Sequence, residues 1–211
     1  MEKLPLVALI SGRGSNLKAI IDAADPLVEI RAVISNRPQA AGLIHAQQAG
    51  ISTEIVDHTE FNDRNAFDNA LQKRIDHYQP NLVILAGFMR ILSPEFVAHY
   101  RGRLLNIHPS LLPAFKGLHT HKRALEAGVK EHGASVHFVT ENLDAGPVII
   151  QARVPVWPDD DEDRLAARVL QEEHRIYPQA IQWFAQGRLQ LQGNCVLLDG
   201  NPITSVWRKL T

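Results

Sequence analysis

The chain has 211 residues, with 22 lysine and arginine residues against 23 aspartate and glutamate residues, a formal net charge of −1 and 45% hydrophobic residues. This composition is typical of a globular protein and excludes a disordered chain, and it lacks the positive charge that nucleic-acid binding requires. The longest apolar run, residues 82–88, is far shorter than the ~20 residues that cross a bilayer. The first residues also show a strand-length apolar run instead of a signal peptide. We therefore expect a soluble cytoplasmic protein that binds neither nucleic acid nor membrane.

Short apolar runs alternate with amphipathic, helix-length segments over the first hundred residues. Strands are expected at residues 6–10, 29–35, 53–56 and 82–86, and helices at residues 16–24, 40–49 and 64–78. In the first helix, Leu17, Ile20, Ile21 and Ala24 have the i, i+3, i+4, i+7 spacing of one buried face. Strands that are apolar on both faces and alternate with helices predict a parallel sheet covered on both sides, and hence an α/β fold.

The second half has a different pattern. A strand at residues 103–108 is stopped by a proline, and strands at residues 134–140 and 148–154 are joined by a turn that contains glycine and proline. These two strands are predicted to pair as an antiparallel extension of the sheet. One long helix follows at residues 161–184, and a closing hairpin is expected at residues 189–191 and 195–198.

The sequence SGRGSN at residues 11–16 lies where the first strand meets the first helix. Backbone N–H groups at a helix N-terminus favour an anion, and Ser15 or Asn16 is expected either to cap the helix or to bind a phosphate oxygen. A dinucleotide fingerprint would need glycine at position 17, which is Leu17, and no Walker lysine follows. The loop therefore favours a single phosphate over NAD or ATP. An ordinary turn with a capped helix is the alternative.

Asn106 and His108 are two residues apart on a predicted strand, so their side chains point to the same face near its carboxyl end. An amide donor beside an imidazole suits a developing oxyanion and a proton transfer, although a hydrogen-bonded strand end is the structural alternative. Asp144 lies in the turn between the two late strands, either as a turn former or as a partner for a histidine. If the three residues meet, they make an acyl-transfer site without a protein nucleophile.

Three other features are ambiguous. Glu173 falls within the apolar stripe of the long helix, where a carboxylate contacts a ligand or forms a structural salt bridge. His119 and His121 have metal-ligand spacing, but no third ligand follows at a convincing distance, so we predict no metal. The single cysteine, Cys195, lies among apolar residues and is expected to be a buried structural thiol.

The sequence NIHPSLLP at residues 106–113 resembles the signature of the folate-dependent formyltransferases. Further similar segments are residues 11–16, 86–92, 117–121, 135–139 and 144–147, and the resemblance runs to about residue 185. The early glycine loop and the lack of extra domains resemble the branch of the family that acts in purine synthesis. The resemblance implies one Rossmann-like domain over residues 1–211, with a phosphate-binding half at 1–100, a folate-binding and catalytic half at 101–211, and a soft boundary.

The resemblance also implies a reaction in which 10-formyltetrahydrofolate, as cosubstrate, passes its formyl group to the amino group of glycinamide ribonucleotide without a metal. Asn106 and protonated His108 would stabilise the oxyanion, and Asp144 would assist proton transfer. Substrate-binding roles fall on Gly14, Ser15, Asn16, Met89 and Glu173. Folate-binding roles fall on Arg64, Arg90, Ile91, Leu92, Val139 and Thr140.

Other functions fit parts of the pattern. A formyltetrahydrofolate hydrolase would use water in place of the amine, and usually has an additional N-terminal regulatory domain. A formyltransferase acting on methionyl-tRNA should carry a C-terminal domain and positive charge. A catalytically silent nucleotide-binding module would need only the glycine loop, and it leaves Asn106, His108, Asp144 and Glu173 unexplained. Arg13 either assists phosphate binding or faces solvent, and the sequence predicts no oligomeric state and no function for the tail after about residue 190.

Overall fold

The computed structural model describes residues 2–203, and the chain divides into two compact units, Met1–Asn106 and Ile107–Thr211. The single domain over residues 1–211 stays a prediction, and positions 1 and 204–211 of that range lie outside the described residues.

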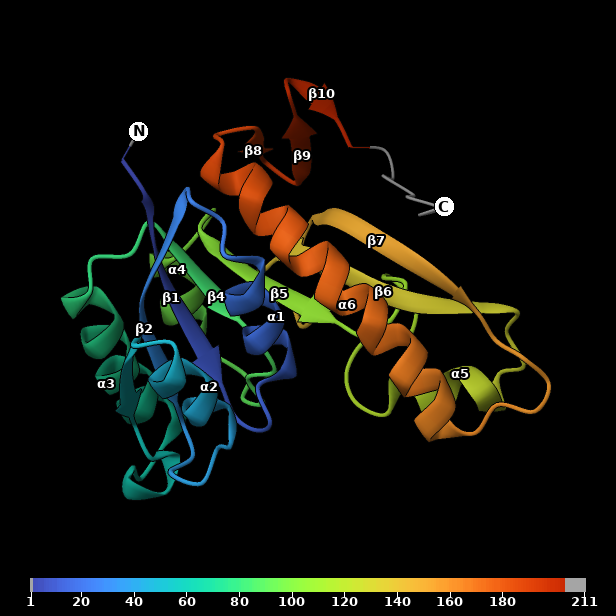
Figure 1. The fold of residues 1–211 in the computed structure, drawn as a ribbon, viewed down its shortest axis with the longest axis horizontal. Coiled ribbons are helices and arrows are strands. Elements are labelled where there is room, and N and C mark those ends of the chain that lie inside the picture. The colour runs from blue at the N-terminus through green and yellow to red at the C-terminus, as the bar shows by residue number, and fades with distance from the viewer. Residues whose placement is uncertain (1, 204–211) are drawn as a thin grey trace. The chain divides into compact units, whose positions relative to one another are not determined.

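The first unit is built from strands that alternate with helices (Figure 1). In chain order its elements are β1 (Leu4–Ile10), α1 (Ser15–Ala23), β2 (Val28–Ser35), α2 (Gly42–Gln48), β3 (Ser52–Ile55), η1 (His58–Glu60), α3 (Arg64–His77), β4 (Leu82–Leu85), α4 (Pro94–His99) and β5 (Leu104–His108), of which β5 ends in the second unit. The strands are parallel in the order β3-β2-β1-β4-β5, which confirms the predicted parallel sheet. β1 and β4 form its buried centre, because residues 6–10 and 82–85 are almost wholly inaccessible to solvent.

Short helices account for the elements that sequence periodicity missed in this unit. α4 has six residues, fewer than two turns, so it carries too few apolar positions to show a helical period. Its start is nevertheless well specified, because the Ser93 hydroxyl accepts the backbone N–H of Phe96 and Pro94 occupies the first turn.

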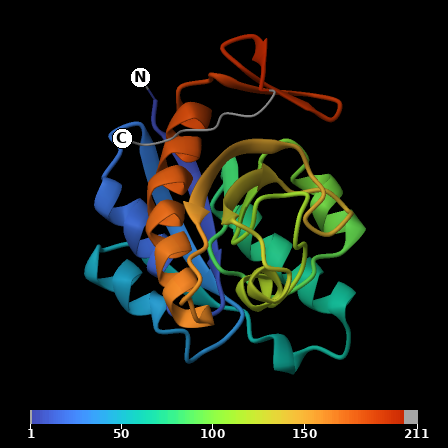
Figure 2. The ribbon, with the colours of Figure 1, turned by 90° about the vertical axis from the view of Figure 1, so that its right-hand side faces the viewer.

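The second unit contains α5 (Thr120–Glu126), β6 (Glu131–Phe138), β7 (Val148–Pro155) and the 24-residue helix α6 (Glu162–Ala185). β6 and β7 pair antiparallel, as predicted, and α6 packs against both strands (Figure 2). The Asp161 side chain caps α6 by accepting the backbone N–H of Arg164.

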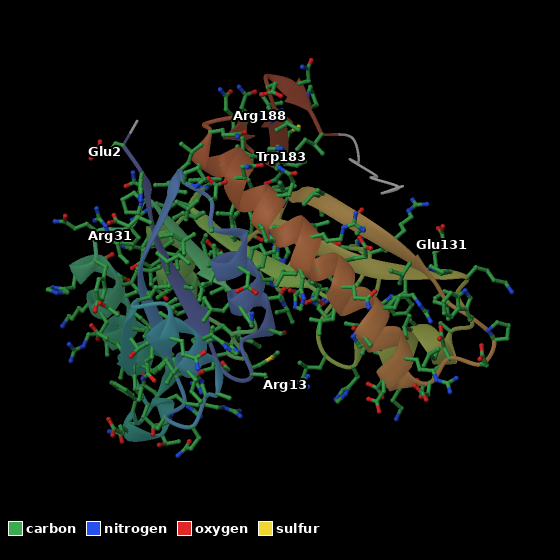
Figure 3. The ribbon with its side chains drawn as sticks, in the orientation of Figure 1. Glu2, Arg13, Arg31, Glu131, Trp183 and Arg188 are labelled. Carbon is green, nitrogen blue, oxygen red and sulfur yellow. The ribbon has the colours of Figure 1, made fainter. Side chains whose placement is uncertain are left out.

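A three-stranded sheet, β8 (Leu189–Gln192), β9 (Cys195–Leu198) and β10 (Asn201–Pro202), follows α6. The predicted hairpin is confirmed, and Arg188 joins it to the end of α6 by pairing with Asp199 and lying over the Trp183 ring (Figure 3). The expectation of a buried Cys195 is wrong, because this residue opens β9 beside the hairpin turn and is an exposed free thiol.

No helix among residues 2–203 is both long enough and apolar enough to cross a membrane.

Candidate active site

The glycine loop of the first unit presents a helix N-terminus. Gly14 is the N-cap of α1, with φ of +72°, and a Cβ placed there would lie 2.5 Å from Cα of Gly42, so only glycine fits. Of the two roles expected for Ser15 or Asn16, capping the helix or binding a phosphate oxygen, the N-cap position is instead occupied by Gly14, because α1 begins at Ser15. The start of α1 presents the positive end of the helix dipole, which favours an anion. Arg13 is exposed in the same loop (Figure 3).

The segment that follows β4 carries predicted ligand contacts on an apolar surface. Met89 and Ile91 are 65% and 60% exposed, although they are large hydrophobic residues, which is a recurrent feature of ligand-contacting surfaces. Leu92 is half-buried, and the Arg90 guanidinium lies 4.8 Å from the centre of the Phe67 ring. Arg64 is the exposed first residue of α3.

A buried carboxylate in this region was missed by the sequence reasoning. Asp68 on α3 is buried, and its Oδ2 accepts the backbone N–H of Ser93 at 2.6 Å. Burial raises the pKa of Asp68, while the hydrogen bonds from Ser93 and the charges of Arg64 and Arg90 oppose the shift. Asp68 lies three residues before Leu71 and seven before Ile75, which are both buried. This helical spacing is the sequence feature that could have placed Asp68 on the inner face of α3.

His108 and Asp144, 36 positions apart in the sequence, meet within the second unit. Nδ1 of His108 lies 3.4 Å from Oδ2 of Asp144, and the two side chains are 7% and 8% exposed. The other ring nitrogen of His108, Nε2, donates to the carbonyl of Phe115 at 3.0 Å. The Asp144 carboxylate therefore faces Nδ1 while Nε2 is bonded to the backbone, and these two contacts fix the orientation of the ring. Asn106 precedes His108 by two residues on β5 and is half-buried.

A second histidine, missed at the sequence level, faces the other oxygen of Asp144. His137 Nε2 lies 3.8 Å from Oδ1 of Asp144, and its Nδ1 donates to the carbonyl of Phe138 at 2.9 Å. Burial lowers the pKa of His137 and so favours the neutral ring, with the nearby charge of Asp144 among the opposing influences. The sequence feature that could have identified His137 is its position as a polar residue within the otherwise apolar end of β6.

The turn between β6 and β7 fixes the position of Asp144. Asp144 has φ of +45°, and its Oδ2 also accepts the backbone N–H of Gly117 at 2.9 Å. A Cβ at Gly146 would lie 1.8 Å from the carbonyl oxygen of Phe138, so the turn closes tightly on the end of β6 only with glycine there. β6 ends at Phe138, so the predicted strand end at residue 140 is wrong and Val139 and Thr140 belong to the turn segment.

Two buried polar residues hold the segment after His108 against the β6–β7 pair. The Ser135 hydroxyl donates to the carbonyl of Ser110 at 2.6 Å and accepts the N–H of Leu112 at 3.1 Å. The Gln151 amide donates to the carbonyl of Leu112 at 2.9 Å and to the Ser135 hydroxyl at 2.8 Å. These contacts keep buried polar groups satisfied and fix the position of the chain immediately beyond the histidine.

Glu173 lies on the buried face of α6, as its place in the apolar stripe predicted. Val169, Ile176 and Tyr177 are buried on the same helix. Among residues 2–203, no group of three or more histidine, cysteine, aspartate or glutamate side chains is arranged to hold a metal ion.

Known proteins resemble the chain over nearly its whole length. Phosphoribosylglycinamide formyltransferase of Escherichia coli strain K12 is 58% identical over 198 residues, which are 92% of this chain and 93% of that protein. The human trifunctional purine biosynthetic protein adenosine-3 is 46% identical over 196 residues, 92% of this chain but 19% of that protein. A solved structure of phosphoribosylglycinamide formyltransferase from Coxiella burnetii, in complex with CHES, has a TM-score of 0.92 and 58% identity, and the match covers 95% of this chain and 96% of that one.

The fold is accordingly that of the formyltransferase structures, a mainly parallel sheet flanked by helices, with antiparallel strands in the C-terminal half. A buried histidine–aspartate pair that follows an asparagine is consistent with acyl transfer without a protein nucleophile. Together with a family model described as formyl transferase, which matches residues 4–181, these findings show that the chain belongs to the formyl transferase family.

Proposed function

We propose that this chain transfers the formyl group of 10-formyltetrahydrofolate to the amino group of glycinamide ribonucleotide, giving formylglycinamide ribonucleotide and tetrahydrofolate. The observation that carries the proposal is the 58% identity, over 92% of the chain, to the E. coli phosphoribosylglycinamide formyltransferase. The partners are then two small molecules, with 10-formyltetrahydrofolate as cosubstrate and no metal. Such an enzyme of purine synthesis acts in the cytoplasm and needs neither nucleic acid nor membrane.

In this reaction the amine nitrogen attacks the formyl carbon and forms a tetrahedral oxyanion. The C–N bond to N10 of the folate then breaks, so the amine nitrogen loses one proton and N10 gains one. Asn106 donates a hydrogen bond to the oxyanion, the His108 imidazolium stabilises it by its positive charge, and Asp144 stabilises that imidazolium and assists the proton transfer. The 3.4 Å separation between His108 and Asp144 supports these roles.

The ribonucleotide phosphate binds at the glycine loop through Gly14, Ser15 and Asn16. The start of α1 directly after Gly14 supports this assignment, because a helix N-terminus favours an anion. Met89 contacts the reacting end of the ribonucleotide, and Glu173 accepts hydrogen bonds from the ribose hydroxyls.

The folate binds through apolar contacts, backbone groups and two cations. Arg64 attracts the carboxylates of the folate tail, for which its exposure at the start of α3 is suited. Arg90, Ile91 and Leu92 line the site where the two substrates meet. Val139 and Thr140 contact the pteridine, largely through backbone groups.

The deciding experiment measures tetrahydrofolate formation from 10-formyltetrahydrofolate, with and without glycinamide ribonucleotide, in EDTA. We expect turnover that depends on the ribonucleotide and persists in the chelator. Equal turnover without the ribonucleotide would identify a hydrolase, and no turnover in either reaction would favour a non-catalytic nucleotide-binding module.

A further inference from the structure

Ser11 joins the ends of three neighbouring strands in the first unit. It follows β1 directly, is 4% exposed, and β1 lies between β2 and β4 in the sheet. Its hydroxyl donates to Oδ1 of Asn36 at 2.6 Å and accepts the backbone N–H of Met89 at 2.8 Å. Asn36 follows β2 and Met89 lies beyond β4, so one buried hydroxyl bridges the two segments that flank β1.

The direction of these bonds follows from their chemistry. A backbone N–H can only donate, so the Ser11 oxygen accepts from Met89, and the hydroxyl proton is left for the amide oxygen of Asn36. Asn36 is 1% exposed, and its backbone carbonyl accepts the Nδ1–H of His58 at 2.7 Å. The acceptor that orients the serine hydroxyl is therefore itself held in place.

Ser11 also begins the glycine loop. Gly12 accepts the N–H of Gly42 at 2.9 Å, and Gly14 lies so close to Gly42 that neither position has space for a Cβ. The loop is thus braced against α2 on one side, while the hydroxyl of its first residue is bonded to Met89 on the other. Ser11 is therefore joined to the segment after β4 by its hydroxyl, through Met89, and by its backbone N–H, which donates to the carbonyl of Gly87 at 3.2 Å.

We infer that Ser11 is a positioning residue that couples the glycine loop to residues 89–92, so that an occupied loop holds this segment in the conformation that binds the second substrate. The inference rests on the proposed function, because it takes the loop as the phosphate site and residues 89–92 as the meeting point of the substrates. Ser11 touches neither substrate in this scheme and acts through the backbone of Met89.

Ser11→Ala tests the coupling, and Ser35→Ala is its matched control. Ser35 is also buried. Its hydroxyl donates to the carbonyl of Arg37 at 2.8 Å and accepts the N–H of Arg37 at 3.0 Å. The control removes the same chemical group from the same sheet, but its bonds are local. In Ser11→Ala the Met89 N–H and Oδ1 of Asn36 lose their partner. Leaving buried polar groups unpaired lowers the population of the conformation seen in the unmodified chain by roughly tenfold or more.

Hydrogen–deuterium exchange of the backbone amides gives a readout that does not depend on turnover. In ligand-free Ser11→Ala we expect the Met89 amide to exchange at least ~10-fold faster than in the unmodified chain, and in Ser35→Ala at the unmodified rate. Glycinamide ribonucleotide should slow exchange over residues 12–16 in all three proteins, but over residues 89–92 only where Ser11 is present. The KM for 10-formyltetrahydrofolate should rise about tenfold in Ser11→Ala alone, with a smaller change in kcat.

The two proposals fail in different ways. If the Met89 amide exchanges at the same rate in Ser11→Ala and Ser35→Ala, or if exchange rises throughout β1, β2 and β4, the coupling role is overturned. If glycinamide ribonucleotide leaves residues 12–16 unprotected in the unmodified chain, the phosphate assignment is wrong, and with it the coupling of the two substrates. Protection at residues 12–16 with faster exchange confined to residues 89–92 of Ser11→Ala supports both.

Discussion

Replacing Asp144 by asparagine removes one charge from the candidate active site and changes little else. The amide is nearly isosteric with the carboxylate. In the unmodified chain the backbone N–H of Gly117 donates to Oδ2 of Asp144 at 2.9 Å, and the amide oxygen of asparagine can still accept this bond. The negative charge that lies 3.4 Å from His108 Nδ1 is lost. Because the two side chains are 7% and 8% exposed, water does little to screen their attraction.

The expected size of the effect follows from this distance. Two unit charges 3.4 Å apart attract by about 5 kcal/mol at an effective dielectric constant near 20. The amide dipole and local rearrangement recover part of this energy, which leaves about 3–4 kcal/mol of lost support for the imidazolium in the transition state. A barrier raised by that amount slows catalysis by roughly 10²–10³-fold.

The assay is kcat/KM for ribonucleotide-dependent tetrahydrofolate formation, with urea unfolding to confirm that the variant is folded. Asp76→Asn is the control, because Asp76 also pairs with a histidine, Nε2 of His99 at 3.1 Å, but those side chains are 40% and 36% exposed. We expect the control to stay within about threefold of the unmodified chain. The reasoning would be refuted by a folded Asp144→Asn protein that keeps a third of the activity, or by equal losses in the two variants.

Three further predictions concern an oxyanion donor, the glycine loop and a buried histidine. Asn106→Ala should lower kcat by about 10²–10³-fold with the fold intact, as loss of one oxyanion donor does, and near-normal turnover would remove its assigned role. Gly14→Ala should destabilise the chain by at least about 1–2 kcal/mol and raise the KM for glycinamide ribonucleotide, because φ is +72° there and Cβ would meet Gly42; unchanged urea unfolding and KM would contradict this. Burial, with smaller contributions from His121 and His108, lowers the pKa of His132 from 6.5 to about 4. His132 therefore takes up a proton below pH ~6.5 in the unfolded chain but only below about pH 4 in the folded chain. Because protons then bind the unfolded state preferentially, the free energy of unfolding should fall by about 2 kcal/mol between pH 7 and pH 5. The same fall in a His132→Leu variant, measured by urea titration, would show that another group is responsible.

Much of the fold could be predicted because its causes are local in the sequence. Apolar runs alternating with amphipathic segments specify the parallel strands and their helices, and the glycine–proline turn after β6 specifies the antiparallel pair with β7. The two-residue period of a strand is sufficient to place Asn106 and His108 on one face. The pattern was uninformative for α4 and α5, which have six and seven residues and too few turns to show a period.

The candidate site residues were predicted one by one, but their arrangement could not be predicted. Asp144 was expected either to form a turn or to pair with a histidine, and its 3.4 Å approach to His108 depends on how the turn beyond β6 closes around Gly146. His137, Asp68, Ser135 and Gln151 were missed because a polar residue on an apolar face can be recognised as buried, but the sequence does not show which groups it contacts. Cys195 was wrongly expected to be buried for a related reason, since apolar neighbours do not reveal that a residue begins a strand beside a turn.

The sequence by itself determined most of the strands and helices and their apolar faces, and it supplied the candidate catalytic residues, because hydrophobic periodicity and turn chemistry act between near neighbours. The tertiary structure decided which distant groups meet. The Ser11 hydroxyl and the Met89 amide are 78 positions apart and 2.8 Å from each other, and only the packing of β4 beside β1 brings them together. Such a contact depends on how whole strands and helices pack and form hydrogen bonds with one another. A short stretch of sequence does not contain this information.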